Sequence, residues 1–264
     1  MSETNPAIRL HIEGGVATVT LSQPERGNPI DGAFCREFRQ LALDLWNAQG
    51  LRVVHLRAEG KNFSFGGDVK KFLTVLDTFP ELVREWTADL HTGLSRFWRL
   101  DVPVVAEVQG FAMGGAVALL AGGDVVVAAQ SAKFGSAFTQ LGFSCDTGSS
   151  VTLTARMGQA RARRFLLLAE MLGVEEAKAS GLVDVVVADE QLAETTLATV
   201  KRLAAGPTLA YAQIKRLVRN SATTPPEVQL EDEALTMARV CGSADAREGV
   251  TAMAERRKPV FRGA

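Results

Sequence analysis

Hydrophobic and polar positions alternate near the start of the chain and then change to a helical spacing. The segments Ile8–Ile12 and Val16–Leu21 alternate on either side of a Glu-Gly-Gly turn, which predicts a β-hairpin. After Asp31, large apolar residues recur at steps of four, three and four, which predicts an amphipathic helix. The fold is therefore expected to begin with a hairpin that leads into a helix.

Strands and helices alternate along the middle of the chain. Short runs rich in β-branched residues predict strands at Leu51–Leu56, Val102–Val108, Val125–Ala129 and Val183–Val187. Helices are expected near residues 69–76, 81–100, 114–121, 160–171 and 175–179. Because parallel strands need crossover connections, which are usually helices, this order predicts an α/β fold with a parallel sheet.

The last third of the chain is predominantly helical. Helices are expected at 190–205, 208–220 and 227–240, and Pro225-Pro226 separates the last two. These helices lie beyond the last predicted strand, so we expect them to pack as an appendage or against a partner.

Composition and charge exclude several classes of function. The net charge is −1 without a basic block, and aromatic residues make up 6% with a single tyrosine, so no nucleic-acid partner is expected. Three scattered cysteines without a CxxC spacing argue against a disulfide framework and for a reducing compartment. Three histidines provide no zinc-binding spacing, so no metal site is expected.

The sequence also argues against a membrane protein. The N-terminal residues contain no apolar signal segment. The most apolar stretch, Val102–Ala129, is interrupted by Glu107, Gln109 and Asp124 and by several glycines, which is typical of buried strands and a buried helix. We therefore expect a cytoplasmic protein without a membrane span.

Two glycine-rich loops are the clearest chemical feature of the sequence. The segments Phe65-Gly66-Gly67-Asp68 and Met113-Gly114-Gly115-Ala116 each follow a predicted buried strand and open a helix. Amides in the first turn of a helix have no acceptor within the helix, so two such amides on one oxygen would form an oxyanion hole. The alternative is that each loop is only a tight turn. No dinucleotide-binding glycine pattern, P-loop or nucleophile elbow is present.

Five ordered motifs resemble the crotonase (enoyl-CoA hydratase/isomerase) superfamily over nearly the whole chain. They are KNFSFGGD at 61–68, QGFAMGGA at 109–116, AKFG at 132–135, AKASGLVD at 177–184 and ERRKPVF at 255–261. The resemblance implies a crotonase-like spiral of ββα turns over 1–200. It also implies a C-terminal helical segment over 201–264 that builds a homotrimer, often doubled to a hexamer.

The same resemblance implies a substrate and a way to hold it. The substrate is an acyl-CoA thioester whose carbonyl oxygen accepts hydrogen bonds from the amides of Gly67 and Gly115, and CoA enters as part of the substrate, with no separate cofactor. Hydratases of the superfamily use two glutamates, and the corresponding positions are Ala118 and Phe138 in this chain. Because neither side chain transfers a proton, hydration of an enoyl-CoA is disfavoured.

One acid follows these positions. The segment LGFSCDTGS at 141–149 resembles a stretch of the acyl-CoA double-bond isomerases, in which a single aspartate moves a proton between carbons. The resemblance implies that Asp146 is the acid–base group of a 3-enoyl-CoA to 2-enoyl-CoA isomerisation, or of its ring equivalent. Burial beside Phe65 and Phe138 is expected to raise its pKa. The alternative role for Asp146 is a helix cap.

Two other functions stay open. The Asp146 segment also resembles the nucleophile segment of aryl-CoA dehalogenases, which implies a dehalogenase or thioesterase in which Asp146 attacks carbon and His91 activates water. His91 flanks an apolar helical stripe, where a histidine commonly only packs. Because the two hydratase glutamates are missing, the chain is alternatively a catalytically silent acyl-CoA-binding paralogue.

The remaining candidate residues are substrate contacts. Along the acyl pocket they are Phe65, Gly66, Asp68, Gly114 and Phe138, and along the CoA they are Arg26, Lys61 and Lys258. A surface lysine or arginine is alternatively only solvated. The three tryptophans, Trp46, Trp86 and Trp98, are expected in the core rather than at the ligand.

Overall fold

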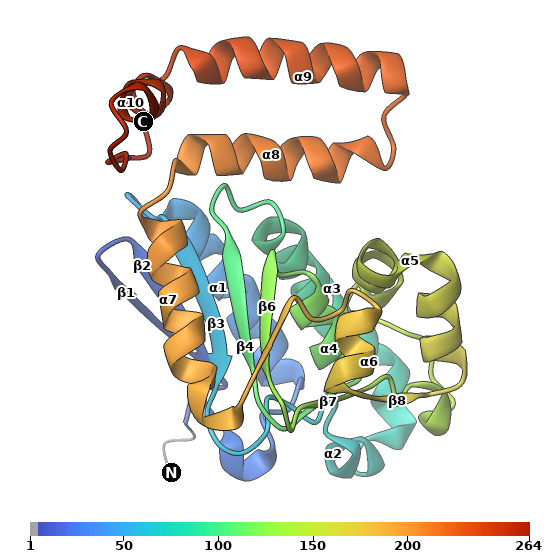
Figure 1. Cartoon of the computed structure of the whole chain (residues 1–264). Coiled ribbons are helices and arrows are strands. Elements are labelled where there is room, and N and C mark those ends of the chain that lie inside the picture. The colour runs from blue at the N-terminus through green and yellow to red at the C-terminus, as the bar shows by residue number, and fades with distance from the viewer. Residues whose placement is uncertain (1–4) are drawn as a thin grey trace.

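The computed structural model describes residues 5–264, which form an α/β fold around a six-stranded sheet (Figure 1). The strand order is β1-β2-β3-β4-β6-β9, with bounds Ile8–Glu13, Val16–Leu21, Val53–Ala58, Val104–Val108, Val125–Ala129 and Val185–Val187. β1 and β2 form an antiparallel hairpin, and the other neighbouring pairs are parallel. The expected hairpin and parallel sheet are confirmed. The expectation that the N-terminal residues contain no signal segment falls partly on residues 1–4, which lie outside the described residues.

The structure also contains a second sheet of three strands, which the hydrophobic pattern does not predict. They are β5 (Phe111–Met113), β7 (Lys133–Gly135) and β8 (Met171–Gly173), and β7 pairs in parallel with β5 and antiparallel with β8. Strands of three residues are too short to show an alternating pattern. The helix expected at 160–171 is therefore wrong at its end, because α5 spans Ser149–Leu167 and Met171 belongs to β8.

Helices cover both faces of the large sheet. α1 (Gly32–Asn47) and α3 (Phe79–Phe97) pack against each other on one face, and α7 (Leu192–Ala204) covers β3, β4 and β6 on the other (Figure 1). α1 begins where the sequence predicts. The Asp31 carboxylate accepts hydrogen bonds from the first amides of this helix at 3.0 and 3.1 Å, which stabilises the helix end.

The shorter helices support the loops between strands. α2 spans Val69–Leu73, α4 spans Gly115–Ala121 and α6 spans Val174–Ala179, and short 3-10 helices lie at Pro24–Arg26, Leu76–Thr78, Thr139–Leu141 and Asp189–Gln191. Every residue of α4 is buried, and this helix packs against α5. The core therefore fixes the position of the second glycine-rich loop, which ends where α4 begins.

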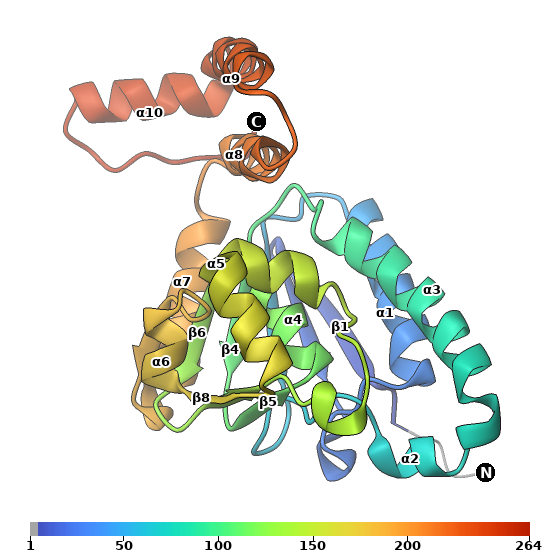
Figure 2. The same cartoon turned by 90° about the vertical axis from the view of Figure 1, so that its right-hand side faces the viewer.

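Three C-terminal helices stand apart from the sheet (Figures 1 and 2). They are α8 (Thr208–Ser221), α9 (Pro226–Cys241) and α10 (Ala244–Ala254), of which the sequence predicts the first two. Lys215 attaches α8 to the core, because its Nζ donates to the Val102 carbonyl and to the Asp124 carboxylate, both at 2.6 Å. The expected boundary between residues 200 and 201 falls within α7 and stays a prediction. None of the helices within residues 5–264 has the length and apolarity needed to cross a membrane.

Candidate active site

The two glycine-rich loops run side by side because backbone hydrogen bonds join them. Ser64 forms an isolated parallel bridge with Ala112, in which the Ser64 amide donates to the Phe111 carbonyl and the Met113 amide donates to the Ser64 carbonyl, both at 3.0 Å. Gly66 has a φ of +76°, and a Cβ at this position would lie 2.6 Å from the Met113 carbonyl oxygen. A side chain at Gly66 would therefore separate the two loops.

The amides of Gly67 and Gly115 are free to donate. Gly115 is the first residue of α4, so its amide has no acceptor within that helix. No hydrogen bond among residues 5–264 engages the amide of either glycine, and both glycines line the same cavity. Two uncommitted amides at one cavity are the arrangement that an oxyanion hole requires.

The cavity has a volume of about 590 Å³ and is largely apolar. Six of the residues predicted from the sequence line it: Phe65, Gly67, Gly114, Gly115, Phe138 and Asp146. Among its lining residues in the described part of the chain, Asp146 has the only charged side chain. Cys35 also lines the cavity, and burial, followed by the negative charges of Asp31 and Asp146, raises the pKa of its thiol to about 12. The thiol therefore stays protonated and is a poor nucleophile.

Asp146 is held by the residue that follows it. The Thr147 hydroxyl donates to the Asp146 carboxylate at 2.8 Å. Burial raises the pKa of Asp146, and the weaker opposing effects are this hydrogen bond and the charge of His91. The expectation of a raised pKa is confirmed in direction. A carboxylate with a raised pKa is a stronger base when ionised.

The carboxylate of Asp146 does not cap α5. The helix begins at Ser149, and Asp146 contributes its backbone carbonyl, which accepts from the Ser149 amide at 2.9 Å and from the Ser149 hydroxyl at 2.7 Å. Among the side chains of residues 5–264, only that of Thr147 donates to the carboxylate. The helix-cap alternative is therefore wrong for this side chain, which is directed at the cavity.

Thr147 joins the acid to the second glycine. It is buried, has a φ of +53° and contacts Gly115 so closely that a Cβ on the glycine would overlap the Thr147 hydroxyl oxygen. Ala137, on the same cavity, also has a positive φ of 56°. Non-glycine residues in this region are strained, and such strain concentrates at functional sites. The sequence gives no signal for either conformation.

Several predicted residues lie outside the cavity. His91 is exposed on α3 and lines a separate hollow of about 300 Å³ with Trp98, Arg99 and Arg219. Its charge nevertheless lowers the pKa of Asp146, so the two side chains are within electrostatic range. Gly66 is buried and is not among the residues that line the cavity, and Lys61 and Lys258 are exposed.

Arg26 and Asp68 form an ion pair at the entrance to α2. The Arg26 guanidinium donates to the Asp31 carboxylate at 2.8 Å and to the Asp68 carboxylate at 2.9 Å. Asp68 also accepts from the Lys71 amide at 3.0 Å, which caps α2. Burial opposes ionisation of Asp68, but the hydrogen bonds from Lys71 and Arg26 together lower its pKa. Both side chains are engaged with protein groups, and their substrate-binding roles stay predictions.

The tryptophans expected in the core have different places. Trp46 is 53% exposed at the surface, so that expectation is wrong, whereas Trp86 packs against the core and also lines the cavity, a contact that the sequence does not predict. Trp98 packs across Gly122 and Gly148, where a Cβ on either glycine would overlap the ring. A stripe of apolar residues on a helix does not distinguish a cavity wall from a filled core, which is why the sequence pattern misses Trp86.

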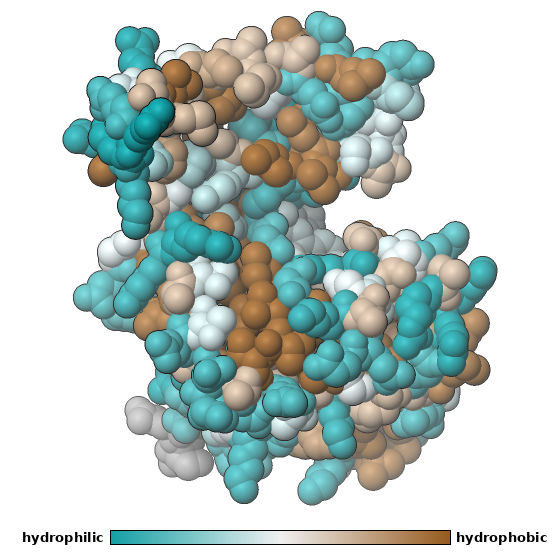
Figure 3. Space-filling model, viewed as in Figure 1, coloured by the Kyte–Doolittle hydropathy of each residue, from teal (hydrophilic) through white to brown (hydrophobic). Residues whose placement is uncertain are grey.

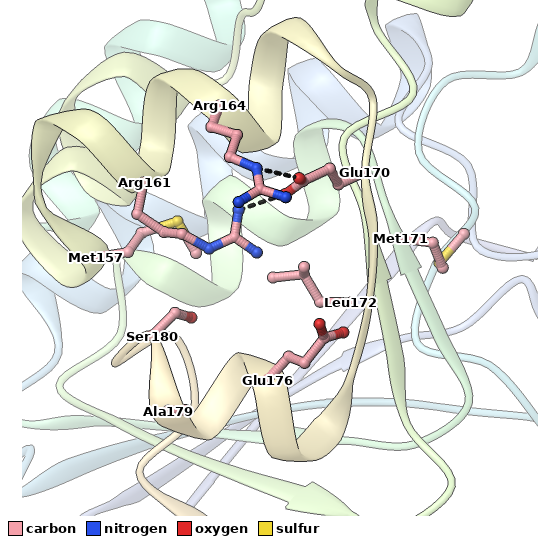
Figure 4. A pocket seen from close by; sticks show the side chains of 9 residues that line it. All are labelled: Met157, Arg161, Arg164, Glu170, Met171, Leu172, Glu176, Ala179 and Ser180. Atoms are coloured by element: carbon pink, nitrogen blue, oxygen red, sulfur yellow. Dashed lines mark hydrogen bonds and ion pairs between the residues drawn. The ribbon is translucent and has the colours of Figure 1, made fainter.

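A second hollow of about 640 Å³ lies between α5, β8 and α6 (Figure 4). Arg161 and Arg164 both donate to the Glu170 carboxylate, the second at 2.7 Å, and the apolar side chains of Met157 and Leu172 also line the hollow. The Arg161 hydrogen bond is the main cause of a lowered pKa of Glu170. Glu176 also lines the hollow, so two arginines and two glutamates balance one another in formal charge. No predicted site residue lies there, so the cavity beside the glycines is the candidate active site.

Comparisons with known proteins identify the family. The model of the enoyl-CoA hydratase/isomerase family matches residues 11–264. A 1,2-epoxyphenylacetyl-CoA isomerase of Escherichia coli strain K12 is 33% identical over 254 residues, which cover 96% of this chain and 97% of that protein. A Rhodobacter capsulatus protein named "Probable enoyl-CoA hydratase" is 35% identical over 257 residues, covering 97% of this chain and 98% of that protein.

A solved structure agrees with the sequence relatives. An enoyl-CoA hydratase from Mycobacterium smegmatis matches with a TM-score of 0.87 and 30% identity, covering 97% of this chain and 99% of that chain. The chain therefore belongs to the enoyl-CoA hydratase/isomerase family and is an acyl-CoA enzyme of that family. The crotonase-like α/β fold with a C-terminal helical segment is confirmed. The relatives' names include both hydratase and isomerase, so they do not select the reaction.

Proposed function

We propose that this enzyme moves a C=C double bond of an enoyl-CoA from the 3,4 to the 2,3 position, or catalyses the ring equivalent. The observation that carries the proposal is that Asp146, the one acid among the cavity-lining residues of the described chain, lies beside the two uncommitted amides of Gly67 and Gly115. The residues at the positions of the two hydratase glutamates also support the proposal, because neither can transfer a proton. Ala118 is fully buried in α4, and Phe138 lines the cavity.

The residues divide the reaction between them. The amides of Gly67 and Gly115 donate to the thioester oxygen, and the Asp146 carboxylate takes a proton from C2. The electron pair of the broken C–H bond forms a dienolate that extends from the oxygen to C4, and the negative charge is stabilised by the two amides. The carboxyl group of Asp146 then returns the proton to C4, which leaves the double bond between C2 and C3. One proton leaves and one returns, so no water and no second acid are consumed.

The dehalogenase or thioesterase alternative has less support. It needs a base that activates water next to Asp146, and His91 is exposed outside the cavity. The alternative of a silent acyl-CoA-binding paralogue predicts binding without turnover.

The test is turnover of 3-enoyl-CoA and 2-enoyl-CoA by the purified protein and its Asp146→Asn variant. We expect conversion of the 3-enoyl substrate and a loss of roughly 10²- to 10⁴-fold in kcat for the variant, because the acid–base group is removed. The matched control is Asp44→Asn, which changes an exposed aspartate of α1. Hydration of the 2-enoyl substrate that survives Asp146→Asn, or binding without any turnover, would contradict the proposed function.

We also propose that the protein assembles as a homotrimer or hexamer. Figure 3 shows an apolar band on this face between α7 and α6, and further apolar side chains on α8. On the C-terminal helices, Val218 is 68% exposed, Val250 74% and Met253 83%. Apolar surface of this extent on a separate helical segment is typical of an interface between copies. Light scattering coupled to gel filtration measures the mass directly, and a monomer at micromolar concentration would overturn this proposal.

A further inference from the structure

Four aromatic side chains form one wall of the glycine cavity, here called the aromatic wall. They are Phe72 of α2, Phe79 and Trp86 of α3, and Phe143 of the loop before α5, and all four line the cavity. Phe79 is the centre of the group, with ring centroids 4.7 Å from Phe72, 5.6 Å from Phe143 and 6.3 Å from Trp86. The rings of these pairs are tilted or edge-on, which is the geometry of favourable aromatic contacts.

The aromatic wall starts at the proposed oxyanion hole. A Cβ on Gly67 would lie 2.6 Å from the tip of the Phe72 ring, so this ring contacts the backbone that presents the Gly67 amide. An acyl group whose thioester oxygen accepts from Gly67 therefore enters the cavity next to Phe72. The wall continues from there through Phe79 to Trp86.

Trp86 is fixed in place by a glycine of α1. A Cβ on Gly32 would lie 2.9 Å from Cδ1 of the indole, and Gly32 is buried in the first turn of the helix. The indole edge therefore packs directly on the α1 backbone. A ring held in this way offers a preformed flat surface to a ligand instead of adapting to it.

The charge around the aromatic wall restricts the ligand further. Asp146 is the only charged side chain among the lining residues in the described part of the chain, so a charged acyl tail would find no partner of opposite sign except a cation beside Asp146. A flexible alkyl chain loses rotamer freedom when it is bound and gains only apolar contact. A planar ring loses less freedom and gains the directional contacts of aromatic pairs.

We propose that the acyl group of the substrate is an uncharged, flat and partly unsaturated ring attached close to the thioester, and that Trp86 and Phe79 determine this specificity. The inference rests on the proposed function, because it assumes that the cavity binds the acyl part of a CoA thioester. It assigns a substrate class to that site.

The experiment measures binding of three CoA thioesters that have no double bond to shift. Phenylacetyl-CoA, cyclohexylacetyl-CoA and hexanoyl-CoA are titrated into the full-length protein by calorimetry. We expect phenylacetyl-CoA to bind roughly three- to tenfold more tightly than either of the others, which is the range for one well-formed aromatic contact. Cyclohexylacetyl-CoA separates planarity from size, because its ring is similar in volume but not flat.

Variants of the aromatic wall identify the residues responsible. Trp86→Leu and Phe79→Leu are each expected to reduce the ratio of the hexanoyl-CoA dissociation constant to the phenylacetyl-CoA dissociation constant to about one. The matched control is Trp46→Leu, which changes an exposed tryptophan of α1 and leaves the ratio unchanged. Gly32→Ala displaces the indole without changing its chemistry and is expected to reduce the ratio as well.

Three results would contradict these proposals, and they are distinguishable. If no CoA thioester binds, the proposed function fails together with the inference. If all three thioesters bind equally to the unchanged protein, only the inference fails. If phenylacetyl-CoA is preferred but both leucine variants keep the preference, the aromatic wall is not its cause.

Discussion

The two large hollows of the molecule are similar in volume and differ in what surrounds their carboxylates. In the glycine cavity, of about 590 Å³, Asp146 accepts a hydrogen bond from the Thr147 hydroxyl and has a raised pKa. In the hollow of about 640 Å³, Glu170 is bound by two guanidinium groups and has a lowered pKa. A carboxylate neutralised by two cations is a weak base, whereas a desolvated one without a cation is a stronger base. Volume alone would therefore select the wrong hollow.

The largest effect that sharpens this comparison is expected from Thr147→Val. The valine has nearly the same shape but cannot donate to Asp146, so the carboxylate loses both its positioning contact and an interaction that lowers its pKa. We expect kcat for isomerisation to fall about tenfold, as for the loss of a contact made to the reacting group. The acid limb of the pH–rate profile should move to higher pH. Thr92→Val, at an exposed position of α3, is the control, and an unshifted profile in Thr147→Val would show that the hydroxyl does not act on the acid.

The two carboxylates should also affect stability in opposite directions. The pKa of Asp146 is raised above its ordinary 3.8, so ionisation of this carboxyl opposes folding. The free energy of unfolding therefore decreases as the pH rises from 3.8 through the raised pKa. The pKa of Glu170 is lowered below its ordinary 4.5, so it contributes stability above that value, which is lost as pH falls through the lowered pKa.

Thermal unfolding at pH 7 tests these signs. We expect Asp146→Asn to raise the Tm by roughly 2–4 °C, because a buried charge is removed, and Glu170→Gln to lower it by roughly 1–2 °C, because a partly exposed ion pair is broken. At pH 3 the difference between each variant and the unchanged protein should shrink as the carboxylates become protonated. Tm shifts of the same sign for both variants at pH 7 would contradict the opposite effects of the two carboxylates on stability.

The smallest effect concerns the thiol that shares the cavity with Asp146. With a pKa of about 12, Cys35 is almost entirely protonated at pH 8, whereas Cys241 is exposed. We expect iodoacetamide to modify Cys241 and to leave Cys35 unmodified over the same period, as measured by mass spectrometry of peptides. Equal modification of the two thiols would mean that the cavity does not desolvate the acids that line it.

The sequence predicts the parts of the site that depend on backbone motifs. The two glycine loops are predicted from their positions between strands and helices, and the resemblance to the family selects Gly67, Gly115 and Asp146. All three line one cavity. Their catalytic roles stay proposals. His91 shows what residue spacing does not predict. Its position on a helix does not determine whether the side chain enters the glycine cavity, and in the structure it lines a separate hollow.

The parts that the sequence misses depend on contacts between distant segments. Phe72 and Trp86 pack on Gly67 and Gly32, which lie on other elements, and Thr147, whose φ is positive, packs against Gly115. The second sheet is missed for a local reason, since three residues give no periodicity. Most long periodic elements are therefore predicted, with the exceptions of the first part of α5 and of α10, whereas the aromatic residues of α2 and α3 that line the cavity are missed.

Three rings of the aromatic wall come from one short stretch of chain. Phe72, Phe79 and Trp86 follow one another at intervals of seven, whereas the glycine amides and Asp146 lie on other segments. Residues 72–86 thus carry three of the four rings on one segment, which is supported from outside by Gly32 and Gly67. Substrate choice and proton transfer therefore depend on different segments of the chain, and a family member that changes this segment together with Gly32 would accept a differently shaped acyl group while it keeps the same proton-transfer residues.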